Sequence, residues 1–211
     1  MFKVLSISAL CRITVSLLAA AFALSSAPAM AAGDPAAGET KIATCAGCHG
    51  SDGKALLPEN PNLAGQHASY LVKQLKEYQS GERVNAIMAG MSATLSEQDI
   101  EDISAYYASQ APVAGVADEE NLELGQSIYR GGITAAGIPS CSGCHGATGN
   151  GNPAAVWPAL AGQNAAYVKA QLEYFRSKER ANDSNAMMRS IAERLTDNEI
   201  EAVSNYIQGL H

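Results

Sequence analysis

The chain has 211 residues, enough for one medium-sized domain or two small ones. Hydrophobic residues make up 47% of it and charged residues 17%, a balance typical of globular proteins and not of disordered ones. The formal net charge of −7 argues against nucleic acid as a partner, because a polyanion binds basic surfaces. An acidic surface suits docking to basic patches on partner proteins, and it serves equally well to keep a protein in solution.

Residues 1–31 have the pattern of a secretory signal peptide. Lys3 and Arg12 accompany an apolar run over residues 13–24, and a small-x-small pattern then predicts cleavage before Ala32. This run is too short for a membrane-spanning helix, and no later stretch approaches the ~20 apolar residues that a span needs. We therefore expect an exported protein that is soluble or at most peripherally attached to a membrane.

Removal of the signal peptide leaves all remaining cysteines in two short motifs. It takes away Cys11 and two of the 14 basic residues, so the mature charge is 12 minus 21, or −9. This charge divides into −5 over residues 32–113 and −4 over residues 114–211, so neither half is strongly charged relative to the other.

The mature sequence consists of two copies of one pattern. The matching segments are CAGCHG at 45–50 and CSGCHG at 141–146, NLAGQ at 62–66 and ALAGQ at 159–163, Gln74-Leu75 and Gln171-Leu172, and residues 95–110 and 195–210. The offset between the copies grows only from 96 to 100, so the insertions are small and lie in loops. The stretch 111–121 is rich in Pro, Gly and Ala and then acidic, as is typical of a linker. We predict domains over residues 32–112 and 122–211, joined by a linker at 113–121.

Each copy is predicted to be helical, without strand-like alternation. Asp34-Pro35 is a suitable N-cap and first-turn pair for the first helix, and residues 122–131 are its counterpart in the second copy. A middle helix follows each LAGQ segment, because apolar residues recur there on one helical face. These residues are Leu71, Leu75 and Tyr78 in the first copy and Val168, Leu172 and Phe175 in the second.

The last helix of each copy begins with a capping box. Ser96 pairs with Asp99 in the first copy, and Thr196 pairs with Glu199 in the second. Long loops rich in Gly, Pro and Asn separate the helices, and such loops in small helical domains usually wrap a bound group. We therefore predict an all-α protein of two domains, each of about 80–95 residues and each completed by a cofactor.

The chemistry of the chain is concentrated in two C-x-x-C-H units. They comprise Cys45, Cys48 and His49 in the first copy and Cys141, Cys144 and His145 in the second. A dithiol switch would accompany a thioredoxin-like strand–helix pattern, which is absent, and structural zinc would have to pool ligands from two distant units. A disulfide between cysteines three positions apart is sterically awkward and leaves the histidine unexplained. C-x-x-C-H is the attachment sequence of haem c, in which both thiols add to the haem vinyl groups and the histidine binds the iron. We predict two covalently bound haem c groups.

The second axial ligand of each iron decides between an electron carrier and a haem with an open site. Alignment on the leucines that precede the last helices pairs Met88 with Met188. The other two methionines of the mature chain, Met91 and Met187, pair with isoleucines. A core side chain can be exchanged for isoleucine, but an iron ligand cannot. We therefore predict Met88 and Met188 as axial ligands and Met91 and Met187 as core residues.

The two histidines outside the motifs are weaker ligand candidates. His67 aligns with Asn164, and His211, at the end of the sequence, has no partner in the first copy. We predict that both occupy exposed polar positions.

Each motif histidine has a candidate hydrogen-bond partner. Pro61 follows His49 by 12 residues and Pro158 follows His145 by 13, in both copies just before LAGQ. A metal-bound histidine normally donates its other ring N–H to an acceptor, and proline offers a carbonyl without an N–H. A proline also stiffens a loop, so the residues alone leave both roles open.

With these features the chain resembles the dihaem cytochrome c4 family, which consists of tandem class I cytochrome c domains from bacterial periplasms. The resemblance covers essentially the whole mature chain. It is carried by the paired CAGCHG and CSGCHG, both LAGQ segments, MAGM at 88–91, YRGG at 129–132 and the terminal SNYIQGLH. It implies two domains related by a pseudo-twofold axis, each wrapping one covalently bound haem. It also implies Met88 and Met188 as iron ligands and the carbonyls of Pro61 and Pro158 as acceptors for the motif histidines.

The resemblance further implies electron transfer in a bacterial respiratory chain. The expected partners are redox proteins: a quinol-oxidising complex or another donor, and a haem–copper terminal oxidase as acceptor. The expected location is the periplasm, and because some members associate with the inner membrane, peripheral attachment stays open.

Two other functions stay open on the sequence. A dihaem peroxidase would need one iron with an open site, which a methionine in both copies argues against. A cytochrome subunit of a periplasmic dehydrogenase would use the same domains, so the sequence separates it poorly from a carrier.

Overall fold

The computed structural model describes residues 33–211, so the predicted signal peptide and its cleavage site lie outside the described residues. In this part of the chain every regular element is a helix, and the only strand-like pairings are two isolated β-bridges. The prediction of an all-α protein is therefore confirmed.

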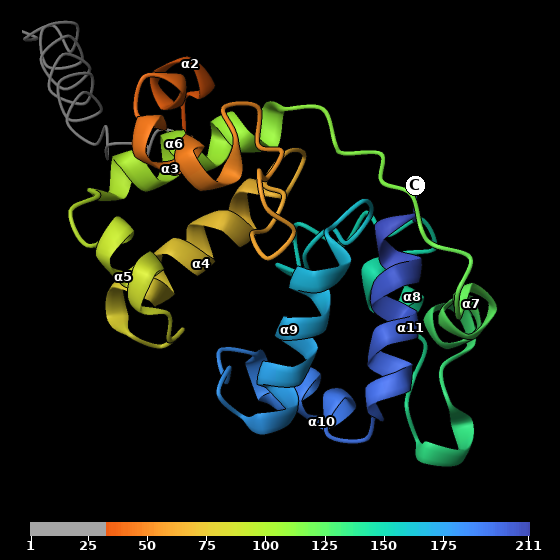
Figure 1. Cartoon of the computed structure of the whole chain (residues 1–211). Coiled ribbons are helices and arrows are strands. Elements are labelled where there is room, and N and C mark those ends of the chain that lie inside the picture. Colours follow the sequence, from red (N-terminus) through yellow and green to blue (C-terminus); the bar gives the residue numbers. More distant parts are fainter. Residues whose placement is uncertain (1–32) are drawn as a thin grey trace, which may run out of the picture. The chain divides into compact units, whose positions relative to one another are not determined.

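The helices form two successive sets, which can be followed along the colour gradient of Figure 1. The first set comprises α2 (Pro35–Glu39), α3 (Ala43–His49), α4 (Ala68–Ser80), α5 (Ala86–Ser92) and α6 (Glu97–Ser109). The second set comprises α7 (Leu122–Gly131), α8 (Ser142–His145), α9 (Ala165–Ser177), α10 (Met187–Ala192) and α11 (Asp197–Gln208), with the 3₁₀ helices η1 (Thr134–Ala136) and η2 (Ser184–Ala186). Residues 111–118 connect the two sets without helical structure.

The predicted helix starts are present in the structure. Asp34 caps α2, whose first residue is Pro35. Both α6 and α11 begin with a capping box, in which a hydroxyl and a carboxylate each bond the backbone N–H of the other residue. The two boxes are Ser96–Asp99 and Thr196–Glu199. The sequence repeat thus corresponds to helices that begin at matching positions in the two sets.

In each set the first and last helices cross at a glycine. Gly38 of α2 lies so close to α6 that a Cβ atom there would overlap the carbonyl oxygen of Asp102. Gly125 of α7 lies in the same way against the carbonyl oxygen of Ala202 in α11. Any larger residue would push these helices apart, so the crossing explains why glycine stands at both positions.

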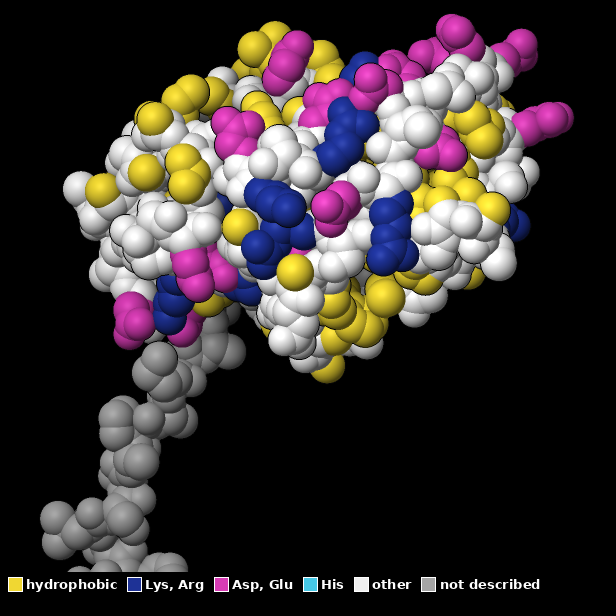
Figure 2. Space-filling model, turned by 90° about the horizontal axis from the view of Figure 1, so that it is seen from below, with side chains coloured by type: hydrophobic (Ala, Val, Ile, Leu, Met, Phe, Trp, Pro, Cys, Tyr) yellow, Lys and Arg dark blue, Asp and Glu magenta, His cyan; other side chains and the backbone are white. Residues whose placement is uncertain are grey.

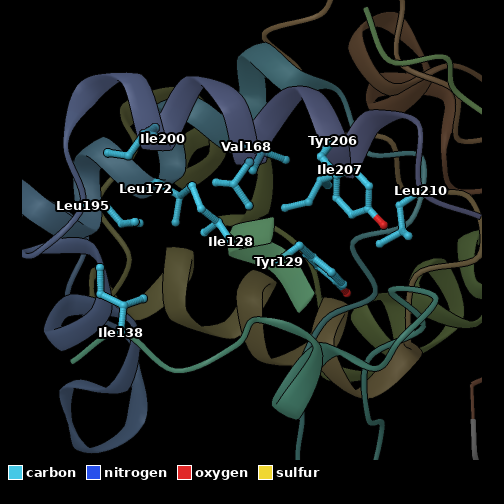
Figure 3. Packing of buried hydrophobic residues seen from close by; sticks show 11 residues of the cluster. Ile128, Tyr129, Ile138, Val168, Leu172, Leu195, Ile200, Tyr206, Ile207 and Leu210 are labelled. Atoms are coloured by element: carbon cyan, nitrogen blue, oxygen red, sulfur yellow. The ribbon is translucent and has the colours of Figure 1, made fainter. Parts of the chain in front are cut away.

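The second set has the larger hydrophobic core. Its cluster of buried side chains lies against α11, as Figure 3 shows, and consists of Ile128, Tyr129, Ile138, Val168, Leu172, Leu195, Ile200, Val203, Tyr206, Ile207 and Leu210. The corresponding cluster of the first set consists of Ile42, Leu71, Ile103 and Tyr107. Leu75, predicted on the buried face of α4, is only half-buried. The first set therefore depends more strongly on a bound group to complete its core.

The two sets contact each other through a buried polar cluster. Arg83 and Arg180 are only 6% and 8% exposed, and each donates hydrogen bonds to side chains of the other set. The acceptors are Tyr167 (3.0 Å) and Gln171 (2.8 Å) for Arg83, and Tyr70 (3.0 Å) and Gln74 (3.1 Å) for Arg180. Each contact has a counterpart with the two sets exchanged, which is the pattern of the predicted pseudo-twofold symmetry.

Acidic and basic side chains are intermixed on the face of the molecule that Figure 2 presents. Figure 2 shows both signs across the face that it presents, with hydrophobic side chains between them. Among residues 33–211, no helix has the length and the apolar character that a membrane crossing requires.

Candidate functional site

Both C-x-x-C-H motifs lie at the end of a short helix. His49 is the last residue of α3 and His145 is the last residue of α8. The next residue in each case is a glycine with positive φ, 75° at Gly50 and 82° at Gly146, so the chain turns sharply after the histidine. Both histidines are 8% exposed. The helices therefore direct both rings into the interior.

A buried tyrosine holds each of these turns. The Tyr107 hydroxyl donates to the Gly50 carbonyl at 3.3 Å, and the Tyr129 hydroxyl donates to the Gly146 carbonyl at 2.7 Å. Tyr107 belongs to α6 and Tyr129 belongs to α7, so the two domains hold the same turn from different helices. Burial raises the pKa of both tyrosines, so both hydroxyls keep their protons and act as donors.

We expect Tyr129→Phe to lower the free energy of unfolding by about 1 kcal/mol, the usual loss for one neutral hydrogen bond. Tyr107→Phe should cost less, because its hydrogen bond is longer. Urea unfolding followed by circular dichroism measures both values. Unchanged stability in both variants would show that these hydroxyls do not hold the two turns.

The four motif cysteines lie in different environments. Cys45 and Cys141 are partly buried against the hydrophobic clusters, whereas Cys48 and Cys144 are exposed. Burial raises the pKa of the Cys45 thiol, and it raises the pKa of Cys141 to about 11. A reactive dithiol needs a lowered thiol pKa, so this environment does not suit a redox switch. It suits attachment of an apolar group between the core and the exposed end of the motif.

A protein-only metal site is not formed in the described part of the chain. No group of three or more His, Cys, Asp or Glu side chains comes together there in a way that could hold a metal ion. The donors instead occur as two separate C-x-x-C-H units, each with one buried imidazole. This donor set fits haem c, which supplies four of the six iron ligands itself.

Each motif histidine is held by a proline carbonyl. His49 Nδ1 lies 3.0 Å from the Pro61 oxygen, and His145 Nδ1 lies 3.0 Å from the Pro158 oxygen. Because a carbonyl can only accept, Nδ1 must carry the proton in both rings. Burial lowers the pKa of both histidines, so each ring is neutral and keeps its Nε2 lone pair. Nε2 is then the nitrogen available to an iron atom.

The predicted methionine ligands lie on separate short helices. Met88 belongs to α5 and Met188 belongs to α10, and both side chains are half-buried. Met188 packs against the same cluster as Cys141, which brings two predicted haem contacts together on one core. In the first domain Cys45 packs against its cluster, while Met88 is not among the residues packed there.

The prediction that Met91 and Met187 are core residues is wrong. Met91 is 50% exposed and Met187 is 39% exposed. Ile87, which pairs with Met187 in the alignment, is also exposed, at 69%. Exchange between methionine and isoleucine shows that a position tolerates an apolar side chain, but apolar side chains are frequent on protein surfaces too. The short helices α5 and α10 bury only the side on which they pack against α4 and α9.

The prediction that His67 occupies an exposed polar position is also wrong, whereas His211 is exposed as predicted. His67 is half-buried, and its Nε2 lies 2.7 Å from the carbonyl oxygen of Asn150. This contact joins the two halves of the chain. The second copy has Asn164 in place of His67, and Asn164 donates to a different carbonyl in the opposite half, that of Asn60. The histidine is therefore not repeated, because the two positions have different partners at the interface.

The repeat also contains polar residues whose role sequence reasoning missed. Gln74 and Gln171 correspond in the two copies, and so do Arg83 and Arg180 at the same offset. The structure buries Gln74, Arg83 and Arg180 in the interface between the halves and leaves Gln171 half-buried there. The signal that could have found them is a polar residue kept in both copies on the middle helix, as at Gln74 and Gln171, or just after its end, as at Arg83 and Arg180.

Comparison with known proteins places these features in a family. The family model described as cytochrome c matches residues 35–111 and again residues 122–211. Over 193 residues the chain is 47% identical to cytochrome c4 of Azotobacter vinelandii, which covers 87% of this chain and 92% of that protein. The chain belongs to the cytochrome c4 family. It is a dihaem electron carrier of two tandem cytochrome c domains, with two covalently bound haem c groups at its two C-x-x-C-H motifs.

Two further relatives bear on the function of the chain. The crystal structure of reduced recombinant cytochrome c4 from Pseudomonas stutzeri matches with a TM-score of 0.83 and 45% identity, over 85% of this chain and 100% of that one. A protein of Stutzerimonas stutzeri described as a thiosulfate dehydrogenase electron acceptor is 39% identical, over 77% of this chain and 76% of that protein. The relatives of this chain therefore include a protein described as an electron acceptor of a dehydrogenase.

Proposed function

We propose that this member of the cytochrome c4 family carries electrons in the periplasm of a bacterium. It would accept them from a quinol-oxidising complex or another donor and pass them to a haem–copper terminal oxidase of a respiratory chain. Export by a signal peptide over residues 1–31 belongs to this proposal, as do domains at 32–112 and 122–211 with a linker at 113–121. Redox proteins are the partners, and any contact with the inner membrane is peripheral.

The proposal assigns the same set of roles in both domains. Covalent attachment falls to the four motif cysteines, and the axial ligands are one histidine and one methionine for each iron. In the first domain these residues are Cys45, Cys48, His49 and Met88, with the Pro61 carbonyl as acceptor for the histidine. In the second they are Cys141, Cys144, His145 and Met188, with the Pro158 carbonyl.

The equivalent setting of the two histidines carries the proposal. Both rings are buried and bonded at Nδ1 to a carbonyl, which leaves Nε2 as the nitrogen available to a ligand in both domains. Each domain also offers one methionine at the same position of the repeat. With protein ligands on both faces of each iron no position is left for a substrate, so we propose a carrier without catalytic activity of its own. A bound haem c supplies one-electron exchange between ferric and ferrous iron.

Oxidation by a terminal oxidase tests this proposal. Reduced protein, mixed with bacterial membranes that contain a haem–copper oxidase, should be reoxidised in a reaction that cyanide stops. The rate should fall as salt is added, because an acidic carrier is steered to a basic docking site. Absence of cyanide-sensitive oxidation would remove the oxidase as acceptor. Turnover of hydrogen peroxide by the oxidised or half-reduced protein would contradict a carrier without an open iron site.

The second candidate is the cytochrome subunit or electron acceptor of a periplasmic dehydrogenase. The observation that favours it is the 39% identity to the protein described as a thiosulfate dehydrogenase electron acceptor. Thiosulfate with a purified thiosulfate dehydrogenase should then reduce this protein faster than a quinol-oxidising complex does. Stable co-purification with a dehydrogenase subunit would favour this candidate, and free diffusion as a single chain would favour the shuttle.

A further inference from the structure

One peptide group of the first domain connects its motif histidine to the second domain. The carbonyl of this group belongs to Pro61 and accepts from His49 Nδ1 at 3.0 Å. The N–H of the same group belongs to Asn62 and donates to Gln163 Oε1 at 2.8 Å. Two hydrogen bonds therefore lie in series, from the imidazole through one peptide group to a side chain of the opposite domain.

The reverse connection starts from the second domain. The carbonyl of Pro158 accepts from His145 Nδ1 at 3.0 Å, and the N–H of the same peptide group, on Ala159, donates to Gln66 Oε1 at 2.9 Å. Gln66 and Gln163 are the final residues of the two LAGQ segments. We call the peptide group whose carbonyl accepts from a motif histidine the histidine peptide of that domain. The sequence repeat thus places each glutamine against the histidine peptide of the other domain.

Both glutamines are fixed in orientation. Each is 7% exposed. Gln163 Nε2 donates to the carbonyl of Asn62, and Gln66 Nε2 donates to the carbonyl of Ala159, both at 2.9 Å. Because the amide nitrogen is taken up by a carbonyl, only the amide oxygen can face the peptide N–H. The contacts of each buried amide group at the interface therefore fix the hydrogen bond from the peptide N–H to the glutamine oxygen.

A hydrogen bond at one end of a peptide group strengthens the other end. A peptide whose N–H is bonded to an acceptor is polarised, so its carbonyl oxygen becomes a stronger acceptor. A stronger acceptor at Nδ1 makes the imidazole a more basic ligand, and a more basic ligand favours ferric over ferrous iron. Loss of the glutamine should reverse both effects.

We propose that Gln163 and Gln66 are positioning residues that tune, crosswise, the reduction potential of the haem in the opposite domain. Gln163 lowers the potential of the first haem through the Asn62 peptide group, and Gln66 lowers that of the second through the Ala159 peptide group. This inference rests on the axial roles proposed above for His49 and His145.

The test is a redox titration of the holoprotein in which each haem is followed by its own methyl resonances in proton NMR. Gln163→Leu removes the acceptor for the Asn62 N–H at similar volume. We expect it to shift the reduction equilibrium of the first haem about threefold towards ferrous iron, with little change at the second. In the reduced protein the His49 Nδ1 proton should move upfield, as a weakened hydrogen bond does. Gln66→Leu should give the mirror image at the second haem and at His145.

Two further variants separate tuning from mere support of the interface. Gln163→Glu keeps an acceptor for the Asn62 N–H, so the potential of the first haem should not rise. Tyr167→Phe removes a hydrogen bond between the domains, the 3.0 Å contact with Arg83, without touching either histidine peptide. It should leave both potentials unchanged. A merely structural role of Gln163 predicts changes of the same sign in Gln163→Leu and Gln163→Glu.

Three results would overturn the inference: no shift in Gln163→Leu, an equal shift of both haems, or a larger shift at the second haem than at the first. Failure of the axial assignment would look different. In that case the Nδ1 proton resonances of His49 and His145 would lack the ring-current shift of iron-bound imidazoles in the wild-type protein as well, before any variant is compared.

Discussion

Met88→Ala and Met188→Ala should each remove about half of the weak thioether-to-iron absorption band in the far red, because each variant opens one of two equivalent irons. The reduction potential of the affected haem should fall strongly, since the thioether favours ferrous iron and water or hydroxide in its place does not. The other haem should keep its band and its potential. Optical spectra with a spectroelectrochemical titration measure both effects.

The chain contains its own controls for this experiment. Met91 lies one helical turn from Met88 in α5, and Met187 is adjacent to Met188 in α10, but both are exposed. Met91→Ala and Met187→Ala should leave the band and both potentials intact. If the band survives in Met88→Ala and Met188→Ala, or disappears in Met91→Ala or Met187→Ala, the predicted ligands are wrong.

The prediction from sequence was strongest where a local pattern determines a local structure. The capping boxes at Ser96 and Thr196 and the Asp34-Pro35 start specify helix ends through hydrogen bonds within a few residues. The helical faces were predicted for the same reason, since their period is that of the helix itself. The carbonyl contacts of Pro61 and Pro158 are present too, although the residues alone left them open.

Contacts between the two halves could not be predicted, because they depend on how two folded domains meet. The burial of Arg83 and Arg180, the position of His67 and the bonds of Gln66 and Gln163 all belong to this interface. The error at Met91 and Met187 has a related origin. An exchange between methionine and isoleucine shows that a position accepts an apolar side chain, but it does not show that the side chain is buried. Burial on a short helix depends on which other elements of the fold pack against it.

The unequal cores predict unequal dependence on the two haems. The first domain buries a cluster of only four side chains, whereas the cluster of the second has eleven. Domains of about 80 residues are marginally stable even with a complete core, so a missing cofactor removes a large share of the apolar burial. Loss of the first haem should therefore cost the first domain essentially all its net stability, about 5 kcal/mol at the lower end for small domains.

A matched pair of variants tests this dependence. Cys45→Ser with Cys48→Ser abolishes covalent attachment in the first domain, and Cys141→Ser with Cys144→Ser does so in the second. Hydrogen exchange followed by NMR should show that the first pair abolishes protection in α4 and α6, whereas the second pair leaves partial protection in α9 and α11. The reason is that α9 and α11 still pack on a cluster built from α7 and their own side chains.

Apoprotein made without the haem-attachment machinery should follow the same order, with the first domain unfolded and the second loosely helical. Equal loss of protection in the two domains, or native-like circular dichroism of the apoprotein, would show that the haems do not complete these cores.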